Sequence, residues 1–314
     1  MSKILIPPIK CQGIKTKIVP LLLENITDLK SGLWIEPFMG SGVVGLNVRP
    51  SKALFADLNP HIIAFYDAIK TKIVTPESSL AFLEHEGRLL REKGESHYYT
   101  VRERFNKEGS PLDFLFLSRS CFNGMIRFNK NGGFNVPFCR KPNRFAGAYI
   151  TKIVNQLTRF SESIHSHSWA FINQDFEKTI SSASEIDFIY CDPPYIGRHV
   201  DYFNSWNASD EERLLRCLSE SKARFILSTW HSNKYRKNEF LDSFWSRFHV
   251  ITKEHFYHVG AREENRNSML EALVMNFVPK SGITRKSANI QRSLFDRLPV
   301  ADPPGYLPRA AQTE

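Results

Sequence analysis

The residues of the sequence that most clearly suggest chemistry are Asp192, Pro193, Pro194 and Tyr195, which directly follow the apolar run 188–191. Two consecutive prolines fix the backbone and lack the N–H groups that would otherwise bind nearby carbonyl oxygens. The turn therefore presents a carboxylate, a free carbonyl and an aromatic face. Together these groups can bind a planar amino group, so we predict that the four residues form a catalytic site.

A second candidate site is the loop Glu36-Pro37-Phe38-Met39-Gly40-Ser41-Gly42. Its glycines allow the backbone to approach a ligand closely, and Asp57, at the end of the next apolar run, can accept hydrogen bonds from ribose hydroxyls. An ordinary tight turn has the same pattern. The loop lacks the third glycine of a dinucleotide fingerprint and the Gly-Lys-Ser/Thr of a phosphate-binding loop, which argues against NAD binding and ATP hydrolysis.

The elements that must position these residues are short β-rich runs separated by helical lengths. The first strand, 33–36, runs through the glycine loop into a helix start at 43–48, and a second strand ends at Asp57. This order is typical of the first half of a doubly wound, mostly parallel α/β sheet. The pattern resumes after residue 164 with further expected strands at 170–172, 186–191, 224–229 and 271–276.

The domain organisation follows from this interruption. We predict a discontinuous catalytic domain made of residues 1–68 and 165–280, with an insertion at 69–164. The remaining segment, 281–314, contains clustered prolines and reads as a loosely attached or disordered tail.

The positive charge of the chain is concentrated in the insertion. The whole chain has a formal net charge of +9, of which 69–164 carries +7, while 165–280 carries −2. No Asp or Glu occurs from Phe114 to Ser161, a stretch that holds eight Lys and Arg. Such a stretch is expected either to bind a polyanion or to form a solvated basic face, and the Asn, Gly and aromatic residues among its cations favour binding.

The composition excludes several other classes of protein. With 42% hydrophobic and 24% charged residues the chain is globular, and no apolar run reaches the roughly 18–20 residues that span a bilayer. The start lacks the apolar core of a signal peptide, so we expect a cytoplasmic protein that does not associate with a membrane. The five cysteines form no C-x-x-C pair, which predicts reduced thiols and no metal site.

In the order of its motifs, the sequence resembles the Dam-like, D12 class of N6-adenine-specific DNA methyltransferases, with the motif order of the α group. Lysines near the N-terminus come first, then the glycine loop, a DNA-recognition insertion and Asp192-Pro193-Pro194-Tyr195. The most specific part is 121–138, which resembles the DNA-reading β-hairpin of the family. Its centre, 129–133, is Asn-Lys-Asn-Gly-Gly, a strong turn sequence between two β-rich arms.

This resemblance implies a class I S-adenosylmethionine-dependent methyltransferase fold, which is Rossmann-like, with an inserted helical DNA-recognition domain. It also implies that S-adenosylmethionine is the cofactor. The cofactor-binding residues it implies are Lys10, Lys15, Glu36, Pro37, Phe38, Gly40, Ser41, Gly42, Asp57, Asp175, Phe176 and Asp192. Among these, Asp175 also has the sequence position of a plain helix N-cap.

The resemblance further implies a set of residues that contact bases or phosphates of double-stranded DNA. They are Arg119, Asn123, Met125, Arg127, Pro137, Arg140 and Lys141. Because Arg119 precedes the hairpin in an apparently helical stretch, a structural role is an equally open interpretation for it. Arg can bind guanine bidentately in the major groove, so Arg127 and Arg140 are the better candidates for reading bases. Cys139 stands where the family usually has glycine, and Met125-Ile126 replaces a commoner Leu-Tyr pair, so no recognition sequence can be transferred from a relative.

The predicted activity is methyl transfer to N6 of an adenine flipped out of the duplex, within a restriction-modification system. A cognate restriction endonuclease is then an expected functional partner. Tyr195 would stack on the flipped base, and the loop 202–206 would either close over it or pack ordinarily. Three alternatives stay open: an N4-cytosine methyltransferase, an enzyme acting on RNA, and a non-catalytic DNA-binding module.

Overall fold

The computed structural model describes most of the chain. The described residues are 3–11, 13–26, 29, 32–196, 206–256, 268–280 and 283–285. The predicted loop 202–206 lies outside them except for Trp206, and the predicted tail lies outside them except for the backbone of 283–285. These three residues form an edge strand of the sheet, so the expected loose attachment of the tail is wrong for them. No helix of the described part is long and apolar enough to cross a membrane.

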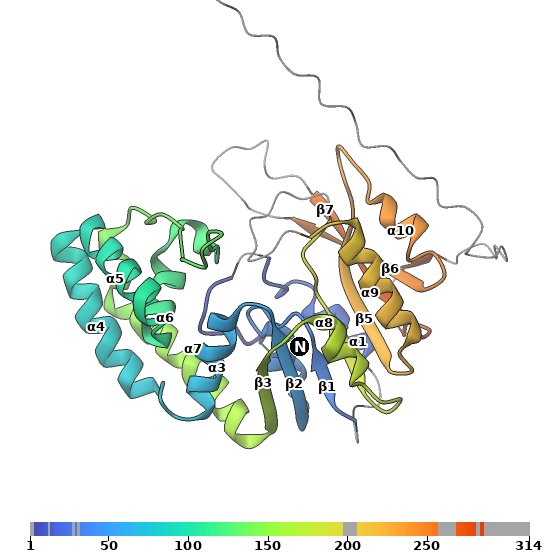
Figure 1. Ribbon diagram of the computed structural model, residues 1–314, viewed down its shortest axis with the longest axis horizontal. Coiled ribbons are helices and arrows are strands. Elements are labelled where there is room, and N and C mark those ends of the chain that lie inside the picture. The colour runs from blue at the N-terminus through green and yellow to red at the C-terminus, as the bar shows by residue number, and fades with distance from the viewer. Residues whose placement is uncertain are drawn as a thin grey trace, which may run out of the picture.

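An eight-stranded sheet forms the centre of the molecule (Figure 1). Across the sheet the strand order is β3-β2-β1-β4-β5-β7-β6-β8. The strands β1 to β5 pair in parallel, and β7 is antiparallel to β5 and β6. The strands are β1 (Trp34–Glu36), β2 (Lys52–Asp57), β3 (Ser168–Asn173), β4 (Phe188–Cys191), β5 (Arg224–Asn233), β6 (His249–Phe256), β7 (Ser268–Met275) and β8 (Ile283–Arg285).

The predicted doubly wound, mostly parallel sheet is confirmed. The sequence analysis missed β6, whose polar residues include Lys253 and Glu254, because a strand near a sheet edge lacks a continuous apolar run. The predicted strand 271–276 begins earlier, at Ser268, where β7 pairs with Phe256 of β6.

Helices cover both faces of the sheet. Those that precede or interrupt the sheet are α1 (Val19–Asn25), α2 (Val43–Val48), α3 (Pro60–Lys70), α4 (Pro76–Lys93), α5 (Glu95–Glu108), α6 (Pro111–Ser120) and α7 (Gly147–Ser166), with the 3-10 turns η1 (Phe122–Gly124) and η2 (Pro142–Phe145). Those of the later half are α8 (Phe176–Ser181), α9 (Ala208–Glu220) and α10 (Glu239–Ser243). The strands β1 and β4 are buried along their whole length, as expected for strands covered on both faces.

Two hydrophobic clusters hold these layers together. One lies between the sheet and α8, α9 and α10, and contains Ile189, Phe225 and Trp245. The other lies on the opposite face and joins α1, α2 and α3 to the inserted helices α4–α7. In α7, Phe160 stacks on Tyr66 of α3 with ring centroids 4.5 Å apart. The insertion therefore shares a hydrophobic core with one face of the sheet.

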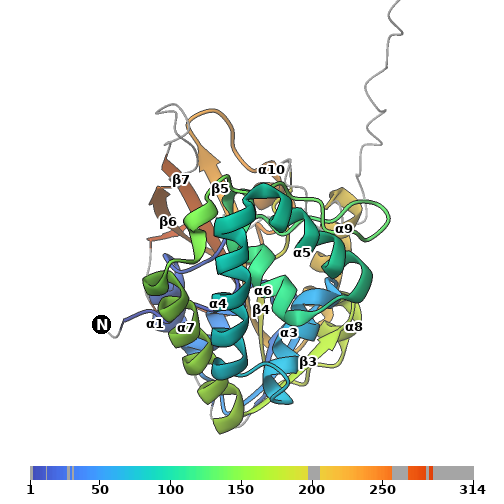
Figure 2. The same cartoon turned by 90° about the vertical axis from the view of Figure 1, so that its left-hand side faces the viewer.

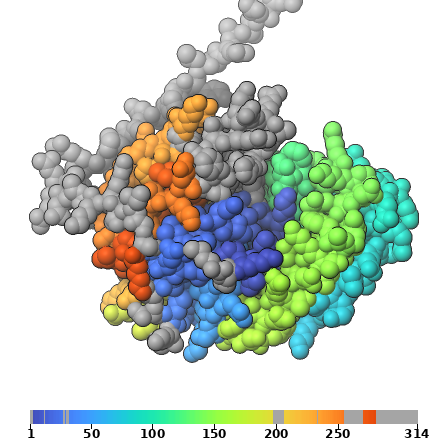
Figure 3. Space-filling model, turned by 180° about the vertical axis from the view of Figure 1, so that it is seen from behind, coloured from blue at the N-terminus to red at the C-terminus, as the bar shows by residue number. Residues whose placement is uncertain are grey.

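The inserted segment stands at one side of the sheet (Figures 1 and 2). Seen from behind, its green surface lies beside the blue N-terminal part (Figure 3). The side chain of Arg119 joins the two parts, because its guanidinium donates to the carbonyl oxygens of Pro7 and Pro8.

The predicted hairpin 121–138 follows a hairpin course but has almost no ladder. Two isolated antiparallel bridges, Cys121–Phe138 and Phe128–Phe134, connect its arms. At its tip the side chain of Asn129 accepts from the amides of Asn131 and Gly133, and the backbone amide of Asn129 donates to the carbonyl of Gly133, so side-chain hydrogen bonds supplement the few backbone bonds between the arms.

Candidate active site

The side chain of Asp192 lies at the carboxyl end of β4, where it pairs with Lys15. The Nζ atom of Lys15 is 2.8 Å from Oδ1 of Asp192, and the two side chains are 8% and 21% exposed. The chain brings these residues together from widely separated positions, because β4 pairs in parallel with β1 and the N-terminal segment passes over the same edge. Asp192 and Lys15, both predicted from sequence, are thus direct neighbours.

Burial dominates the ionisation of this carboxyl group. It raises the pKa of Asp192 to about 6, while the ammonium of Lys15 partly offsets this effect. At pH 7 the carboxylate is therefore ionised, and it loses its charge just below neutrality.

The ring of Tyr195 is fixed from two directions. Its hydroxyl donates to Oε2 of Glu271 at 2.8 Å, and Nζ of Lys15 lies 4.8 Å from the ring centroid. Tyr195 also packs against the buried Trp230. One ammonium thus contacts both the carboxylate and the aromatic ring of the predicted catalytic turn.

Glu271, which is 1% exposed, was missed by the sequence analysis. A signal was present, since a single Glu interrupts the apolar run Leu270-Glu271-Ala272-Leu273-Val274 of β7. A buried carboxylate within a strand requires a polar partner, and here that partner is the hydroxyl of Tyr195.

The glycine loop is tied to the end of β2. Gly40 and Gly42 have positive φ values of 50° and 69°, which favour glycine. The amide of Gly40 donates to Oδ2 of Asp57 at 2.8 Å, and the amide of Asn59 donates to Oδ1 of the same carboxylate at 2.8 Å. The predicted loop and the predicted ribose-binding carboxylate therefore form one hydrogen-bonded unit.

Glu36 and Pro37 of this loop point into the interior. Glu36 is 1% exposed and accepts from Nε1 of Trp34 at 2.7 Å. Burial raises the pKa of Glu36 to about 8. Its carboxyl group is held in the interior by Trp34 and by the backbone of Gly45, so its contribution is to fix the start of the loop.

Asp175 and Phe176 are brought to the same edge, at the start of α8. Asp175 caps this helix by accepting from the amide of Glu177, and it also pairs with Arg213 at 3.0 Å. Phe176 is 2% exposed and stacks on Phe38 with centroids 5.3 Å apart. Asp175 thus has the helix-capping role that the sequence analysis gave as an alternative. Phe176 could pack on an adenine ring only if the side chains that now cover its ring moved away.

Lys10 packs against the start of the predicted hairpin. Its alkyl chain packs so closely on Gly124 that a Cβ there would come within 2.3 Å of its Cδ atom. Burial, assisted by the charge of Arg144, lowers the pKa of Lys10. The structure therefore places this predicted cofactor-binding residue against residues 119–141, which hold the predicted DNA contacts and which we call the recognition segment.

The recognition segment exposes most of the residues predicted to contact DNA. Asn123, Pro137, Arg140 and Lys141 are exposed, whereas Met125 and Arg127 are half-buried. The Nε atom of Arg127 donates to Oδ1 of Asn135 at 2.9 Å. Asn123 and Arg140 have positive φ values of 54° and 57°, a strained backbone that is often found at functional positions.

Arg119 is an exception among the predicted DNA-binding residues. It is 6% exposed, and its guanidinium donates to Pro7, Pro8 and Oε1 of Gln156. These partners occupy its donors inside the molecule, so the predicted DNA contact does not fit the structure. Its position in a helical stretch before the hairpin was the only signal of this structural role.

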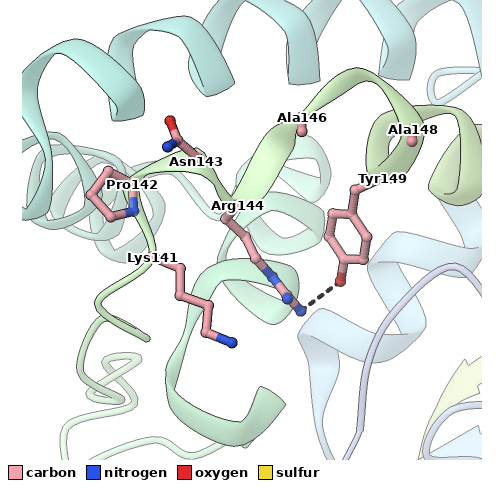
Figure 4. Close-up of a pocket in the computed structure, with 7 residues that line it drawn as sticks. All are labelled: Lys141, Pro142, Asn143, Arg144, Ala146, Ala148 and Tyr149. Carbon is pink, nitrogen blue, oxygen red and sulfur yellow. Dashed lines mark hydrogen bonds between the residues drawn. The ribbon is translucent and has the colours of Figure 1, made fainter.

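A shallow pocket lies on the surface next to these residues (Figure 4). The residues that line it are Lys141, Pro142, Asn143, Arg144, Ala146, Ala148 and Tyr149. The guanidinium of Arg144 donates to the hydroxyl of Tyr149 at 2.7 Å and lies over its ring. The pocket lies beside the exposed Arg140, and Asp192 is not among the residues that line it.

Comparison with known protein families identifies the family to which the chain belongs. The family model of the D12 class N6 adenine-specific DNA methyltransferases matches residues 12–259. The chain belongs to this family. The matched range contains both the glycine loop and the Asp192–Tyr195 turn, so the motif resemblance found in the sequence is confirmed.

Individual relatives agree with this membership. The type II methyltransferase M.FokI of Planomicrobium okeanokoites is 29% identical over 282 residues, which are 86% of this chain and 42% of the relative. A DNA adenine methylase of Vibrio cholerae (El Tor Inaba N16961) is 31% identical over 69% of this chain and 76% of the relative. The type II methyltransferase M.MjaIII of Methanocaldococcus jannaschii is 29% identical over 86% of this chain and 99% of the relative.

The share of each relative that the chain covers differs. The chain spans about two fifths of the length of M.FokI and of the modification methylase StsI, at 42% and 41%. Among solved structures, the rRNA methyltransferase aviRa from Streptomyces viridochromogenes covers 82% of this chain, with a TM-score of 0.32 and 14% identity.

The residues at the carboxyl edge fit the methyl donor of this family, S-adenosylmethionine. A Cβ on Gly40 would meet no atom within 4 Å, so the loop faces open space at this point. Two half-buried carboxylates, Asp57 and Asp175, lie at the ends of the neighbouring strands β2 and β3. Ligands of open α/β sheets bind at such carboxyl ends, and carboxylates there accept from ribose hydroxyls.

Proposed function

We propose that this chain transfers the methyl group of S-adenosylmethionine to N6 of an adenine in double-stranded DNA. The observation that carries the proposal is the ion pair between Asp192 and Lys15 beside Tyr195, at the carboxyl end of β4 in a D12 class chain. The carboxylate of Asp192 and the ring of Tyr195 are both held in place by other side chains, at the same edge of the sheet as the glycine loop.

The carboxylate of Asp192 is the main group that activates the adenine amino group for methyl transfer. Adenine N6 is a poor nucleophile because its lone pair is delocalised into the ring. Asp192, together with a carbonyl of the proline turn, accepts hydrogen bonds from the amino group and favours a pyramidal nitrogen with an available lone pair. Pro193 and Pro194 hold the two acceptors in a fixed relation. Most of the rate enhancement then comes from positioning and electrostatics.

Tyr195 provides the aromatic face on which the flipped base stacks. Flipping removes the adenine from the duplex at a cost of a few kcal/mol, which stacking and hydrogen bonding return in part. Because the ring is buried in the structure, one of its faces must become uncovered when DNA binds. The hydrogen bond to Glu271 keeps the ring oriented during this change.

The cofactor site consists of the Gly40–Gly42 backbone with Asp57, and Asp175 follows at the next strand. When bound, S-adenosylmethionine supplies an electrophilic methyl group on a sulfonium. Asp57 is already oriented by the amides of Gly40 and Asn59, so it need not reorganise to accept ribose hydroxyls.

DNA contacts divide between reading and positioning. Arg127 and Arg140 read bases, whereas Asn123, Met125, Pro137 and Lys141 fit the hairpin against the groove and the phosphates. Relatives named type II methyltransferase and modification methylase support a role beside a cognate restriction endonuclease. We place this activity in the cytoplasm.

The direct test incubates the purified chain with labelled S-adenosylmethionine and unmethylated duplex DNA, and identifies the labelled nucleoside after digestion. The expected product is N6-methyladenine in a fixed sequence context. Label in N4-methylcytosine, equal label on single-stranded RNA, or no label at all would each overturn the proposal. The last result would favour a DNA-binding module without catalysis.

A further inference from the structure

A second basic surface lies outside the recognition segment, in the turn between β5 and α10. Its consecutive residues Lys234, Tyr235, Arg236 and Lys237 are all exposed, and Tyr235 is 71% exposed. We call these four residues the β5–α10 turn. Although residues 165–280 carry a net charge of −2, this turn concentrates three cations in four residues.

The β5–α10 turn is adjacent to the proposed active site. The strand β5 pairs in parallel with β4, so its carboxyl end lies at the same edge as Asp192. Just before the turn, Trp230 packs against Tyr195 and its Nε1 donates to the carbonyl of Ile196 at 3.1 Å. The guanidinium of Arg236 lies 5.8 Å from the Trp230 ring centroid. A duplex from which a base enters this site therefore passes close to the turn.

The base of the turn is held firmly by Asn238. This residue is buried, its amide nitrogen donates to the carbonyl of His231, and its side chain donates to the carbonyl of Trp230. An antiparallel bridge also connects Ser232 with Lys237. Lys237 also forms an ion pair with Asp242 of α10, which it would exchange for a phosphate when DNA binds. The fixed base of the turn reduces the conformational entropy lost on binding.

The recognition segment reaches the same edge from the other side of the active site. In that segment Phe128 stacks on His61, at the start of α3 after β2, with centroids 4.9 Å apart. From β2 the sheet order continues through β1 and β4 to β5. Three strand spacings amount to about 14 Å, similar to the roughly 12 Å width of a DNA major groove. Figure 1 shows α10 and the inserted helices on opposite sides of the sheet.

We propose that the β5–α10 turn binds the phosphodiester backbone of the DNA substrate on the side of the active site opposite the recognition segment. This inference rests on the proposed function, which supplies the duplex. Lysines bind phosphates as point charges and without base specificity, so the turn positions the DNA and does not read it. Two supports on either side of the flipped base would hold the duplex while the base leaves it.

The test compares two double variants that remove equal charge. Lys234→Ala/Lys237→Ala removes the lysines of the turn. Lys52→Ala/Lys222→Ala is the matched control, because Lys52 begins β2 and Lys222 precedes β5, so both exposed lysines lie at the opposite, amino edge of the sheet. Affinity for a duplex that contains the sequence methylated by the wild type is measured by fluorescence anisotropy at about 50 to 200 mM salt.

For the turn variant we expect about tenfold weaker DNA binding at low salt, and a slope of log affinity against log salt that is shallower by about 1 to 2. The KM for S-adenosylmethionine and the sequence context of methylation should not change. The control variant should bind like the wild type. An unchanged salt slope in the turn variant, or an equal loss of affinity in the control, would overturn the inference.

The outcome is separable from that of the proposed function. If the wild type forms N6-methyladenine while the turn variant binds DNA as tightly as the control, only the role of the turn is wrong. If the wild type transfers no methyl group to DNA, the proposed function fails whatever the variants bind. Equal binding to anionic vesicles and to duplex by the wild type, lost in the turn variant, would also overturn a DNA-specific role.

Discussion

The carboxyl edge of the sheet and the recognition segment use polar side chains in opposite ways. At the edge, Asp192 pairs with Lys15, Tyr195 donates to Glu271, and these side chains are largely buried. On the recognition segment, Arg140 and Lys141 are exposed to solvent. The side chains of one region are held in place by contacts within the chain, whereas the other region exposes donors to a partner.

This difference matches two physical requirements. A catalytic group gains most when neighbours hold it in place before the reaction, because no reorganisation is then needed in the transition state. A group that reads or grips DNA must instead exchange water for bases and phosphates, so it stays accessible. The two regions should therefore respond differently to substitution.

The largest effect is expected for Asp192→Asn. The amide keeps the size of the side chain but removes the charge that pairs with Lys15 and accepts from the substrate amino group. We expect kcat to fall about a thousandfold, with DNA affinity within twofold of the wild type. Steady-state methylation and anisotropy measure the two quantities. Parallel loss of DNA binding or of the folded state would show that Asp192 is structural.

Arg119→Met should distinguish a stabilising role of Arg119 in the interior from the predicted contact with DNA. Arg119 lies in the predicted recognition segment but donates three hydrogen bonds in the interior. Its replacement leaves buried carbonyls without donors, so we expect the free energy of unfolding to fall by about 2–3 kcal/mol. Urea denaturation measures this change, with Arg140→Ala as a control that leaves stability unaltered. Normal stability of Arg119→Met together with weak DNA binding would restore the predicted DNA contact.

Arg140→Ala should affect recognition without affecting stability. The exposed guanidinium is expected to read a base, and one such contact contributes about 1–3 kcal/mol of discrimination. We expect kcat/KM for the recognised sequence to fall roughly ten- to a hundredfold, while methylation of near-matched sites falls less. Competition between matched and mismatched duplexes measures the ratio. A uniform loss at all sites would assign Arg140 to the phosphates.

Glu271→Leu tests whether the buried carboxylate positions Tyr195. The substitution removes the carboxylate that accepts from the hydroxyl of Tyr195, so the ring is held less firmly. We expect kcat to fall about tenfold with unchanged DNA affinity, equivalent to about 1.4 kcal/mol. Glu271→Gln retains an acceptor and should restore most of the rate. Full activity of the Leu variant would show that Glu271 does not position Tyr195 for catalysis.

The smallest expected effect is the change of the methylation rate with pH near neutrality. Burial raises the pKa of Asp192 to about 6, and only the ionised form accepts from the substrate. The rate should thus be level above pH 7, half-maximal near pH 6, and lower by about tenfold per pH unit below that. A pH profile of kcat/KM, with circular dichroism to confirm folding at each pH, checks this. A level profile down to pH 5 would contradict the raised pKa.

The sequence was sufficient to predict the groups that lie next to strand ends. Asp57 and Asp192 each follow an apolar strand, and parallel pairing brings such positions to one edge. The distant pairings were not predictable, because nothing local connects Tyr195 with Glu271 or Lys15 with Asp192. Burial was not predictable either, because tertiary packing decides exposure: Glu36, Phe176 and Arg119 are held in the interior, and the structural role left open for Arg119 is the one its hydrogen bonds support.

Single-turnover methylation by rapid quench, with enzyme, cofactor and DNA all saturating, tests most directly whether the two regions divide the work. Saturation removes differences in DNA affinity, so only the step after binding is measured. The account predicts that Arg140→Ala reacts within a fewfold of the wild-type rate, whereas Asp192→Asn remains about a thousandfold slower. Equal slowing of both variants under saturation would contradict the division between a preorganised catalytic edge and an accessible recognition surface.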